Sequence, residues 1–349
     1  MQPEQQTVPA TISKGKFDAA VVAARVIPLS ELVTIPGIEQ LPHELLGYLA
    51  HTPVNLQWMS RPVYWLKRGR SAAAVSDYVD PGWLDEQLGL EDEVRATLHR
   101  VVAAAAAGNT EALQELAGGV PTTISQSAKL QEVLENDEAA LFDVPVEMSG
   151  TWSTIAAAGD PAERAALALN MWNADFRDLV PGFYAMLQSR LIDVRPALWR
   201  SDGPALLYFV DDGDGDTTIW VGWNPHIKAG ELPPFWQTVP EPAQRFLTEV
   251  HPGFTMLDGE SFGLAQPSYM SSFAQWSGWP HGIPEWNREG DFDSRRLLWL
   301  TSNSGDTVYC SSLDLPVGQL VTYTEDTCEV EYFDEALDAL MLSAVPLSS

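Results

Sequence analysis

At 349 residues the chain exceeds the usual size of one domain, and its 45% hydrophobic residues are enough for a sizeable core. Its 20 basic and 48 acidic side chains give a formal charge of −28. This charge argues against binding to nucleic acid or to an anionic membrane, because both require a positive face. A basic protein is the natural complement, although acidity that merely maintains solubility would give the same composition.

The N-terminus lacks the apolar segment of a signal peptide. Its first fifteen residues are polar and include Pro3, Thr7 and Pro9. We expect residues 1–17 to be a flexible leader. The longest apolar run, Val101 to Ala107, is far shorter than the roughly 20 residues that span a bilayer. The sequence therefore predicts a cytoplasmic protein without membrane contact.

Residues 18–230 are predicted to form a helix-rich α+β region of unknown role. Val21–Val33 is typical of a strand, and helical signals dominate from 84 to 191. Apolar residues recur at helical spacing over 90–102 until Gly108 ends the segment, and 130–141 is predicted as another helix. Asp160-Pro-Ala-Glu163 predicts a helix start, because the Asp160 carboxylate can accept hydrogen bonds from first-turn amides.

An Asp-Gly repeat separates two apolar runs in the middle of the chain. Leu206–Val210 and Thr217–Trp223 flank Asp212-Gly-Asp-Gly-Asp216, which predicts a β-hairpin. The alternating carboxylates resemble a calcium loop. However, Thr217 and Trp223 stand where such a loop needs Gly and a bidentate Glu. We therefore interpret the repeat as a turn and predict no metal site.

The last third predicts a separate domain over 231–349. A helix over 239–250 ends at His251-Pro-Gly253, and a terminal helix begins near Asp334. The strands between them are predicted at Leu297–Thr301, Thr307–Ser311, Gln319–Tyr323 and Cys328–Tyr332, with a turn at Ser304-Gly-Asp306. Four Arg, no Lys and 18 Asp or Glu in this part give 4 − 18 = −14, half of the net charge in about a third of the length.

The two cysteines are predicted to be reduced. Cys310 and Cys328 have no metal-type spacing, and in a strand meander one strand lies between them. Their backbones would then be about 9 to 10 Å apart, beyond the roughly 7 Å reach of a disulfide.

The sequence contains no recognisable catalytic, cofactor-binding or metal-binding motif. The six histidines are scattered, and neither a Gly-x-Ser-x-Gly elbow nor a Gly-rich phosphate loop occurs. We therefore predict a protein that is not an enzyme and has no cofactor. A hydrolase of unrecognised family, using dispersed carboxylates and a histidine, is the alternative, because such groups can assemble in space.

A Trp-rich segment with carboxylates is the candidate partner-binding site. Tryptophan is an efficient interface anchor, and carboxylates steer a cationic partner. The same rings would also cover a sheet as core residues. The predicted residues are Trp276, Trp279, Glu285, Trp286, Glu289, Asp291 and Asp293.

The last third resembles the SMI1/KNR4 (SUKH) superfamily. The resemblance lies in Val239-Pro-Glu-Pro-Ala-Gln-Arg-Phe-Leu247, in the strand–turn–strand of 297–311, and in Tyr332-Phe-Asp-Glu-Ala-Leu337. It implies an α+β domain with a mixed sheet and packed helices. Many bacterial members are immunity proteins, so the resemblance implies an antitoxin that binds and occludes a basic protein toxin without catalysis. A regulatory scaffold is the other possibility left open.

Overall fold

The computed structural model describes residues 21–50, 52–109, 112–113, 116, 130–131, 134, 139–141, 150–199, 203–213, 217–225, 232–286, 292–303, 307–324 and 327–345. The predicted leader, the turn at 304–306 and most of the Asp-Gly repeat lie outside these ranges. The fold is α+β, as the sequence predicts.

The chain forms two compact units that do not follow the predicted boundary near residue 230. Unit 1 comprises 1–122, 277–291 and 324–327, and unit 2 comprises 123–276, 292–323 and 328–349. The chain thus leaves unit 2 after Trp276, contributes to unit 1, and returns at Phe292. Residue 230 lies inside unit 2, so the domain prediction is corrected there.

Unit 1 contains a small antiparallel sheet and several helices. Strand β1 (Val21–Arg25) pairs with β2 (Leu56–Ser60). The helices are α1 (Leu29–Leu32), α2 (His43–Ala50), α3 (Arg61–Lys67) and α4 (Pro81–Ala106), with 3₁₀ turns at Ile38–Gln40, Pro53–Asn55 and Ala72–Tyr78. The β-like run predicted over 21–33 is therefore a strand followed by a short helix.

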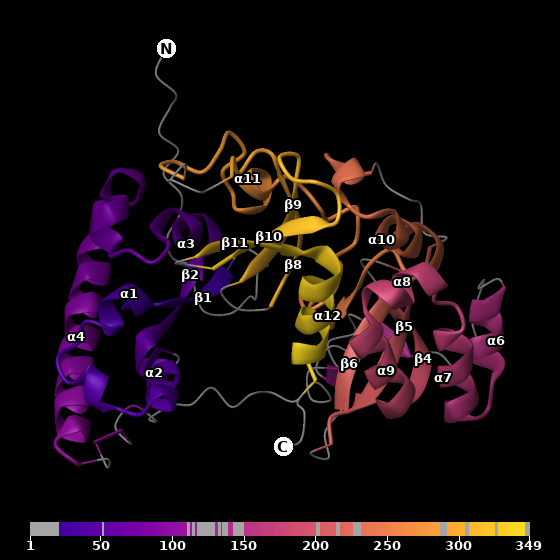
Figure 1. The fold of residues 1–349 in the computed structure, drawn as a ribbon, viewed down its shortest axis with the longest axis horizontal. Coiled ribbons are helices and arrows are strands. Elements are labelled where there is room, and N and C mark those ends of the chain that lie inside the picture. Colours follow the sequence, from indigo (N-terminus) through magenta and orange to yellow (C-terminus); the bar gives the residue numbers. More distant parts are fainter. Residues whose placement is uncertain are drawn as a thin grey trace. The chain divides into compact units, whose positions relative to one another are not determined.

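Helix α4 is the long helix of unit 1 (Figure 1), and its ends follow from the sequence. The Asp80 carboxylate accepts hydrogen bonds from the amides of Gly82 and Trp83, and Pro81 occupies the first turn. Its buried face, which includes Leu98, packs with residues of α1 and α2 in the core of the unit.

Unit 2 contains a five-stranded antiparallel sheet in the order β3-β4-β5-β6-β7. Its strands are β3 (Ala139–Leu141), β4 (Leu191–Trp199), β5 (Gly203–Asp211), β6 (Thr217–Trp223) and β7 (Phe254–Met256). The predicted hairpin is confirmed, because Asp211 pairs with Thr217 across the Asp-Gly turn. The helix predicted over 130–141 is wrong at its end, where Ala139 instead pairs with Trp199.

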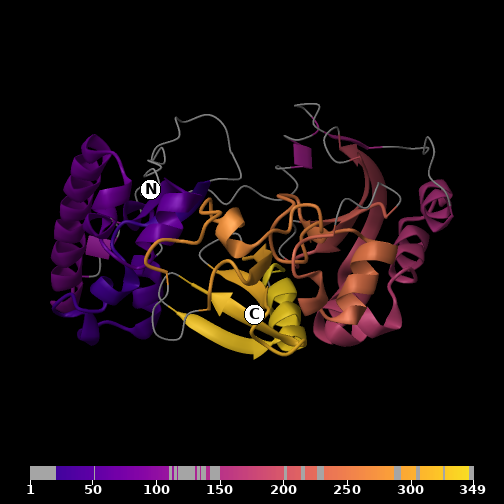
Figure 2. The same cartoon turned by 90° about the horizontal axis from the view of Figure 1, so that it is seen from above.

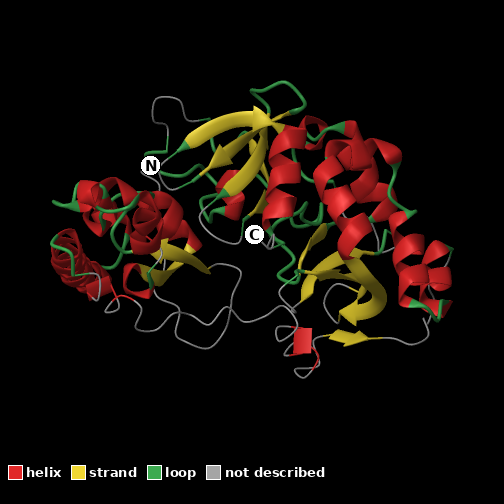
Figure 3. Cartoon of the chain, turned by 60° about the horizontal axis from the view of Figure 1, so that its bottom comes forward, coloured by secondary structure: helices red, strands yellow, loops and turns green. Residues whose placement is uncertain are grey.

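Helices cover one face of this sheet. They are α6 (Thr151–Ala157), α7 (Pro161–Leu169), α8 (Ala174–Leu179), α9 (Pro181–Arg190) and α10 (Glu241–Arg245), which continues as a π-helix over Phe246–Val250. Figure 3 shows the helices gathered on this side of the strands. The predicted cap of α7 is present, since Asp160 accepts a hydrogen bond from the Ala162 amide.

A four-stranded antiparallel sheet in the order β11-β10-β9-β8 completes unit 2. Its strands are β8 (Leu297–Ser302), β9 (Val308–Ser312), β10 (Gln319–Tyr323) and β11 (Cys328–Tyr332), close to the predicted ranges. Helix α12 (Phe333–Ser343) lies beside this sheet (Figure 2), and α11 is Phe273–Trp276. The mixed sheet implied by the family resemblance is therefore not found, since β8–β11 pair antiparallel and the one parallel contact recorded at this sheet is an isolated bridge between Ser261 and Ser302.

Both sheets of unit 2 contribute to one apolar core. This core joins Trp172 and Tyr208 of the earlier region to Leu300 and Leu337 of the last third. Helix α12 also caps α9, because the two oxygens of Asp338 accept hydrogen bonds from the amides of Gly182 (3.0 Å) and Phe183 (2.7 Å). Residues 231–349 on their own would therefore lack much of the apolar surface against which they pack in the whole chain.

A fragment spanning 231–349 is expected to melt broadly, without a cooperative transition, because it loses β3–β6 and helices α6–α9. A fragment spanning 123–349 retains all of unit 2 and should melt in one transition. Thermal unfolding followed by near-ultraviolet circular dichroism compares the two. A sharp transition in the shorter fragment would show that the last third has a sufficient core of its own.

Candidate partner-binding residues

The structure distributes the seven predicted partner-binding residues over both units. Trp279, Glu285 and Trp286 belong to unit 1, whereas Trp276 and Asp293 belong to unit 2. Glu289 and Asp291 lie outside the described residues. Of the five described residues, three thus lie in unit 1 and two in unit 2.

Trp279 is held by the first part of the chain. Its indole Nε1 donates a hydrogen bond to the carbonyl oxygen of Pro62 at 2.9 Å, and its ring meets Tyr78 edge to face. Gly278 permits this approach. Its φ is +85°, and a Cβ there would lie 2.5 Å from Pro62 Cγ. Trp279 thus anchors the segment that begins at residue 277 to the first part of unit 1.

Trp286 is a core residue of unit 1. Only 2% of it is exposed, and its ring lies 6.2 Å from that of Trp65 in an edge-to-face arrangement. The Arg68 guanidinium carbon lies 4.4 Å from the centre of the same ring, a cation–π contact. Trp286 therefore has the core role that the sequence left open for these rings, and its burial inside unit 1 argues against its prediction as a partner-binding residue.

The carboxylates of the predicted site have basic neighbours on the same chain. Glu285 is exposed and forms an ion pair with Arg70 at 3.2 Å. Asp293 is bound by Arg295 at 2.6 Å, and the hydrogen bond from this guanidinium lowers the pKa of Asp293. Pairing of this kind reduces the negative potential that these groups offer to a partner.

Trp276 packs against the four-stranded sheet of unit 2. Its ring stacks on that of Trp299, with 4.9 Å between centroids and 15° between planes, and Phe273 of the same helix stacks on Tyr323. Trp276 is half-buried. It covers the sheet, which is the core role that aromatic residues usually have.

Strand β11 carries exposed apolar residues that the sequence analysis did not single out. Val330 is 47% and Tyr332 60% exposed, and Val317, in the turn before β10, is 60% exposed. Glu329, also exposed, and Glu331 alternate with them along the strand. The alternation of acidic and apolar residues was visible in Cys328-Glu-Val-Glu-Tyr332, but its position at a sheet edge was not.

Unit 1 has an exposed tryptophan as well. All thirteen tryptophans lie within the described ranges, and Trp58 on β2, at 66% exposure, is the one among them that is exposed. It borders a hollow of about 150 Å³ between β2 and α4. Single exposed aromatic residues are common on soluble proteins, so Trp58 is secondary to the cluster on β11.

A buried tyrosine–histidine pair lies in the core of unit 2. His251 Nδ1 is 3.0 Å from the carbonyl oxygen of Trp223, to which it must donate, so Nε2 accepts from the Tyr208 hydroxyl at 2.8 Å. Burial lowers the pKa of His251 to about 4 and raises the pKa of Tyr208. Gly222 leaves room for this ring, since a Cβ would lie 2.7 Å from it. The pair is neutral and out of contact with solvent.

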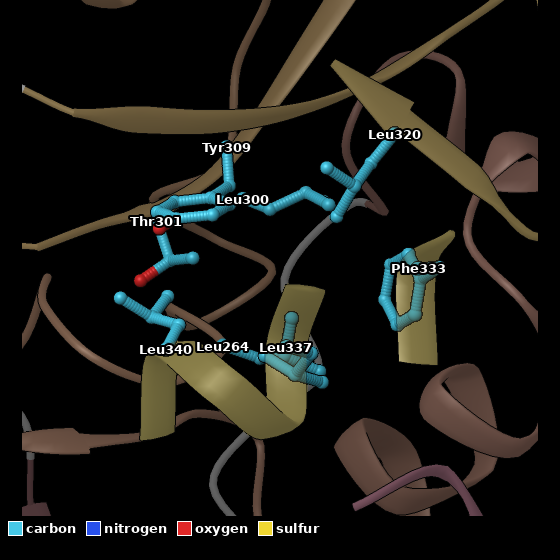
Figure 4. Close-up of a pocket in the computed structure, with 8 residues that line it drawn as sticks. All are labelled: Leu264, Leu300, Thr301, Tyr309, Leu320, Phe333, Leu337 and Leu340. Atoms are coloured by element: carbon cyan, nitrogen blue, oxygen red, sulfur yellow. The ribbon is translucent and has the colours of Figure 1, made fainter. Parts of the chain in front are cut away.

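The space beneath α12 is filled by side chains of the core. Figure 4 shows Leu300, Tyr309 and Leu320 of the sheet with Phe333, Leu337 and Leu340 of the helix. These side chains leave no room for a water molecule. In the described ranges no three His, Cys, Asp or Glu side chains come together so as to hold a metal ion.

Cys310 and Cys328 form no disulfide, and β10 lies between their strands, as predicted. Burial raises the pKa of the Cys310 thiol. No helix in the described part of the chain is long and apolar enough to cross a membrane.

Comparison with known proteins returns no match, whether to a family model, to a curated protein or to a solved structure.

Replacing Trp286 with Ala is expected to lower the free energy of unfolding by about 3–5 kcal/mol, because a buried ring is lost. Glu285→Gln removes only an exposed ion pair and should cost less than about 1 kcal/mol. Urea denaturation of both variants measures the difference. Equal free energies of unfolding for the two variants would show that Trp286 is not a core residue.

His251 should make the protein less stable as the pH falls from about 6.5 to about 4. In this window the unfolded state binds a proton that the folded state excludes, so the free energy of unfolding drops by on the order of 3 kcal/mol. His251→Gln should flatten this part of the curve, whereas His281→Gln, at an exposed position, should not. Urea unfolding at a series of pH values tests both, and an unchanged slope in His251→Gln would contradict the assignment.

Proposed function

We propose that this chain is a cytoplasmic, non-catalytic immunity protein that binds a basic protein toxin and occludes it. The observation on which the proposal rests is the edge strand β11, where the exposed Val330 and Tyr332 lie on one face and Glu329 and Glu331 on the other. Together with the exposed Val317, we call these residues the β11 surface.

The β11 surface combines the two properties of a protein interface. Tyr332 offers a large ring at low cost in side-chain entropy, and Val330 beside it extends the apolar area. The neighbouring carboxylates would attract a cationic partner, because unlike charges speed encounter. The net charge of −28 acts over a longer range in the same direction.

The resemblance of the last third to the SMI1/KNR4 superfamily supports the same function. The residues of that resemblance form α10 and the start of the π-helix, strands β8 and β9, and the junction between β11 and α12, which adjoins the β11 surface. A regulatory scaffold would use such a surface in the same way and differs only in the identity of its partner. The hydrolase alternative gains nothing from His251, because its ring is buried and already hydrogen-bonded at both nitrogens.

The proposal expects a gene for a toxic protein beside the gene for this chain, and it is tested by co-expressing the two. Cells that carry both should survive, and the two proteins should form a complex that associates more slowly as salt is added. Tyr332→Ala should speed dissociation about thirtyfold, the equivalent of an interface anchor worth about 2 kcal/mol. Surface plasmon resonance measures both rates.

Tyr269→Ala is the matched control, because Tyr269 is another exposed tyrosine of unit 2 and is 46% exposed. It should leave dissociation unchanged. Failure to protect the cells, or turnover of an ester, peptide or phosphoester substrate that one substitution abolishes, would overturn the proposal.

A further inference from the structure

We propose that the edge of β11 binds its partner by strand addition, taking an extended segment in which basic and apolar residues alternate. This inference rests on the proposed function, for which it names the kind of partner segment. The hydrogen-bond register of β11, the faces of its side chains and their charge support it.

The backbone of β11 has an outward-facing set of hydrogen-bonding groups. The Phe333 amide donates to Gly318, and the Thr324 amide donates to Thr327, at the two ends of the β10–β11 pair. Hydrogen-bonded pairs alternate in an antiparallel ladder, so the bonded pairs between these ends are 320 with 331 and 322 with 329. Val330 and Tyr332 therefore direct their N–H and C=O groups away from β10.

The two edges of this sheet differ. The outer edge of β8 is covered, because the Phe262 amide donates to Ser302 and the Ala265 amide donates to Leu300. No strand within the described ranges pairs with the outer edge of β11. An edge strand with free backbone groups is a template for another strand.

The side chains of β11 specify what the added strand should contain. Val330 is paired with Val321 on the face that Trp276 and Phe273 cover, and Tyr332 points to the same face. Glu329 and Glu331 point to the opposite face. Residues of the added strand opposite Val330 and Tyr332 should be apolar, and those opposite the two glutamates should be basic.

A second copy of this chain fits the edge poorly. Antiparallel pairing of two β11 strands about Val330 would place Glu329 of one copy opposite Glu331 of the other. Like charges directly opposite each other are destabilising, and both molecules carry a net charge of −28. Charge complementarity thus favours a basic strand of a different protein.

The experiment uses three eight-residue peptides that alternate lysine and valine and are blocked at both ends. One is unmodified, one is N-methylated at its valines, and one is N-methylated at its lysines. In the proposed register the valine amides face β11 and the lysine amides face away. Titration calorimetry with the full chain should show at least about tenfold weaker binding for the valine-methylated peptide and nearly unchanged binding for the lysine-methylated one.

Two variants of the protein test the same hydrogen bonds and charges by changing β11 instead of the peptide. Val330→Pro removes an outward N–H at an edge position where proline is tolerated, and it should weaken binding of the unmodified peptide about tenfold while circular dichroism stays unchanged. Glu329→Lys should also weaken binding, and it should favour a peptide that alternates glutamate and valine. Asp178→Lys, the same charge reversal at an exposed position on α8, is the control that should retain selectivity among the peptides.

Equal binding of the two methylated peptides, or full binding by Val330→Pro, would overturn strand addition. The toxin co-expression test is separate. If cells are protected while the peptides are not distinguished, the proposed function stands and this mode of binding fails. If the peptides are distinguished but no protection occurs, the edge takes basic strands in a protein with another role.

Discussion

Helix α12 buries its apolar face against the adjacent four-stranded sheet and also against residues that precede it by more than a hundred positions. Leu337 and Met341 share a core with Trp172 and Phe183, and Asp338 supplies the hydrogen bonds that the first turn of α9 lacks. This dependence ties the four-stranded sheet to the five-stranded one within unit 2. Helix α12 begins directly after β11, which is the edge strand of the four-stranded sheet.

The sequence was informative wherever local chemistry determines structure. The limits of the strands of the last third were predicted almost to the residue, because turn residues such as Gly318 lie between these short apolar runs. The cap at Asp160 follows from one carboxylate and one proline. The domain boundary failed because proline content and charge density do not report that β6 pairs with β7 across residue 230. Strand pairing over such distances leaves no local signal.

The candidate site was predicted less well, for a related reason. Trp276, Trp279 and Trp286 are close together in the sequence and have similar neighbouring residues. Nevertheless, Trp276 covers a sheet of unit 2, whereas Trp286 is buried in unit 1. A ring is an anchor or a core residue according to what lies across from it, and Trp65 and Arg68 are about 220 residues away in the chain. Conversely, the alternating acidic and apolar residues of Glu329–Tyr332 become a candidate binding site only once the structure shows that they lie on an edge strand.

Residues 277–291 belong to unit 1 although they follow most of unit 2 in the sequence, and this order affects how the chain folds during its synthesis. Residues 1–122 emerge first, but Trp279 and Trp286, which complete their packing, are made only after most of unit 2. Unit 1 must therefore wait, with Trp65 and the Pro62 carbonyl uncovered, while later segments are translated. Domains usually fold from the N-terminus as they appear. In this chain the first-made third lacks part of its packing until residues 277–291 are translated, so its nascent form stays open to proteases and chaperones for longer than a domain made from one continuous segment.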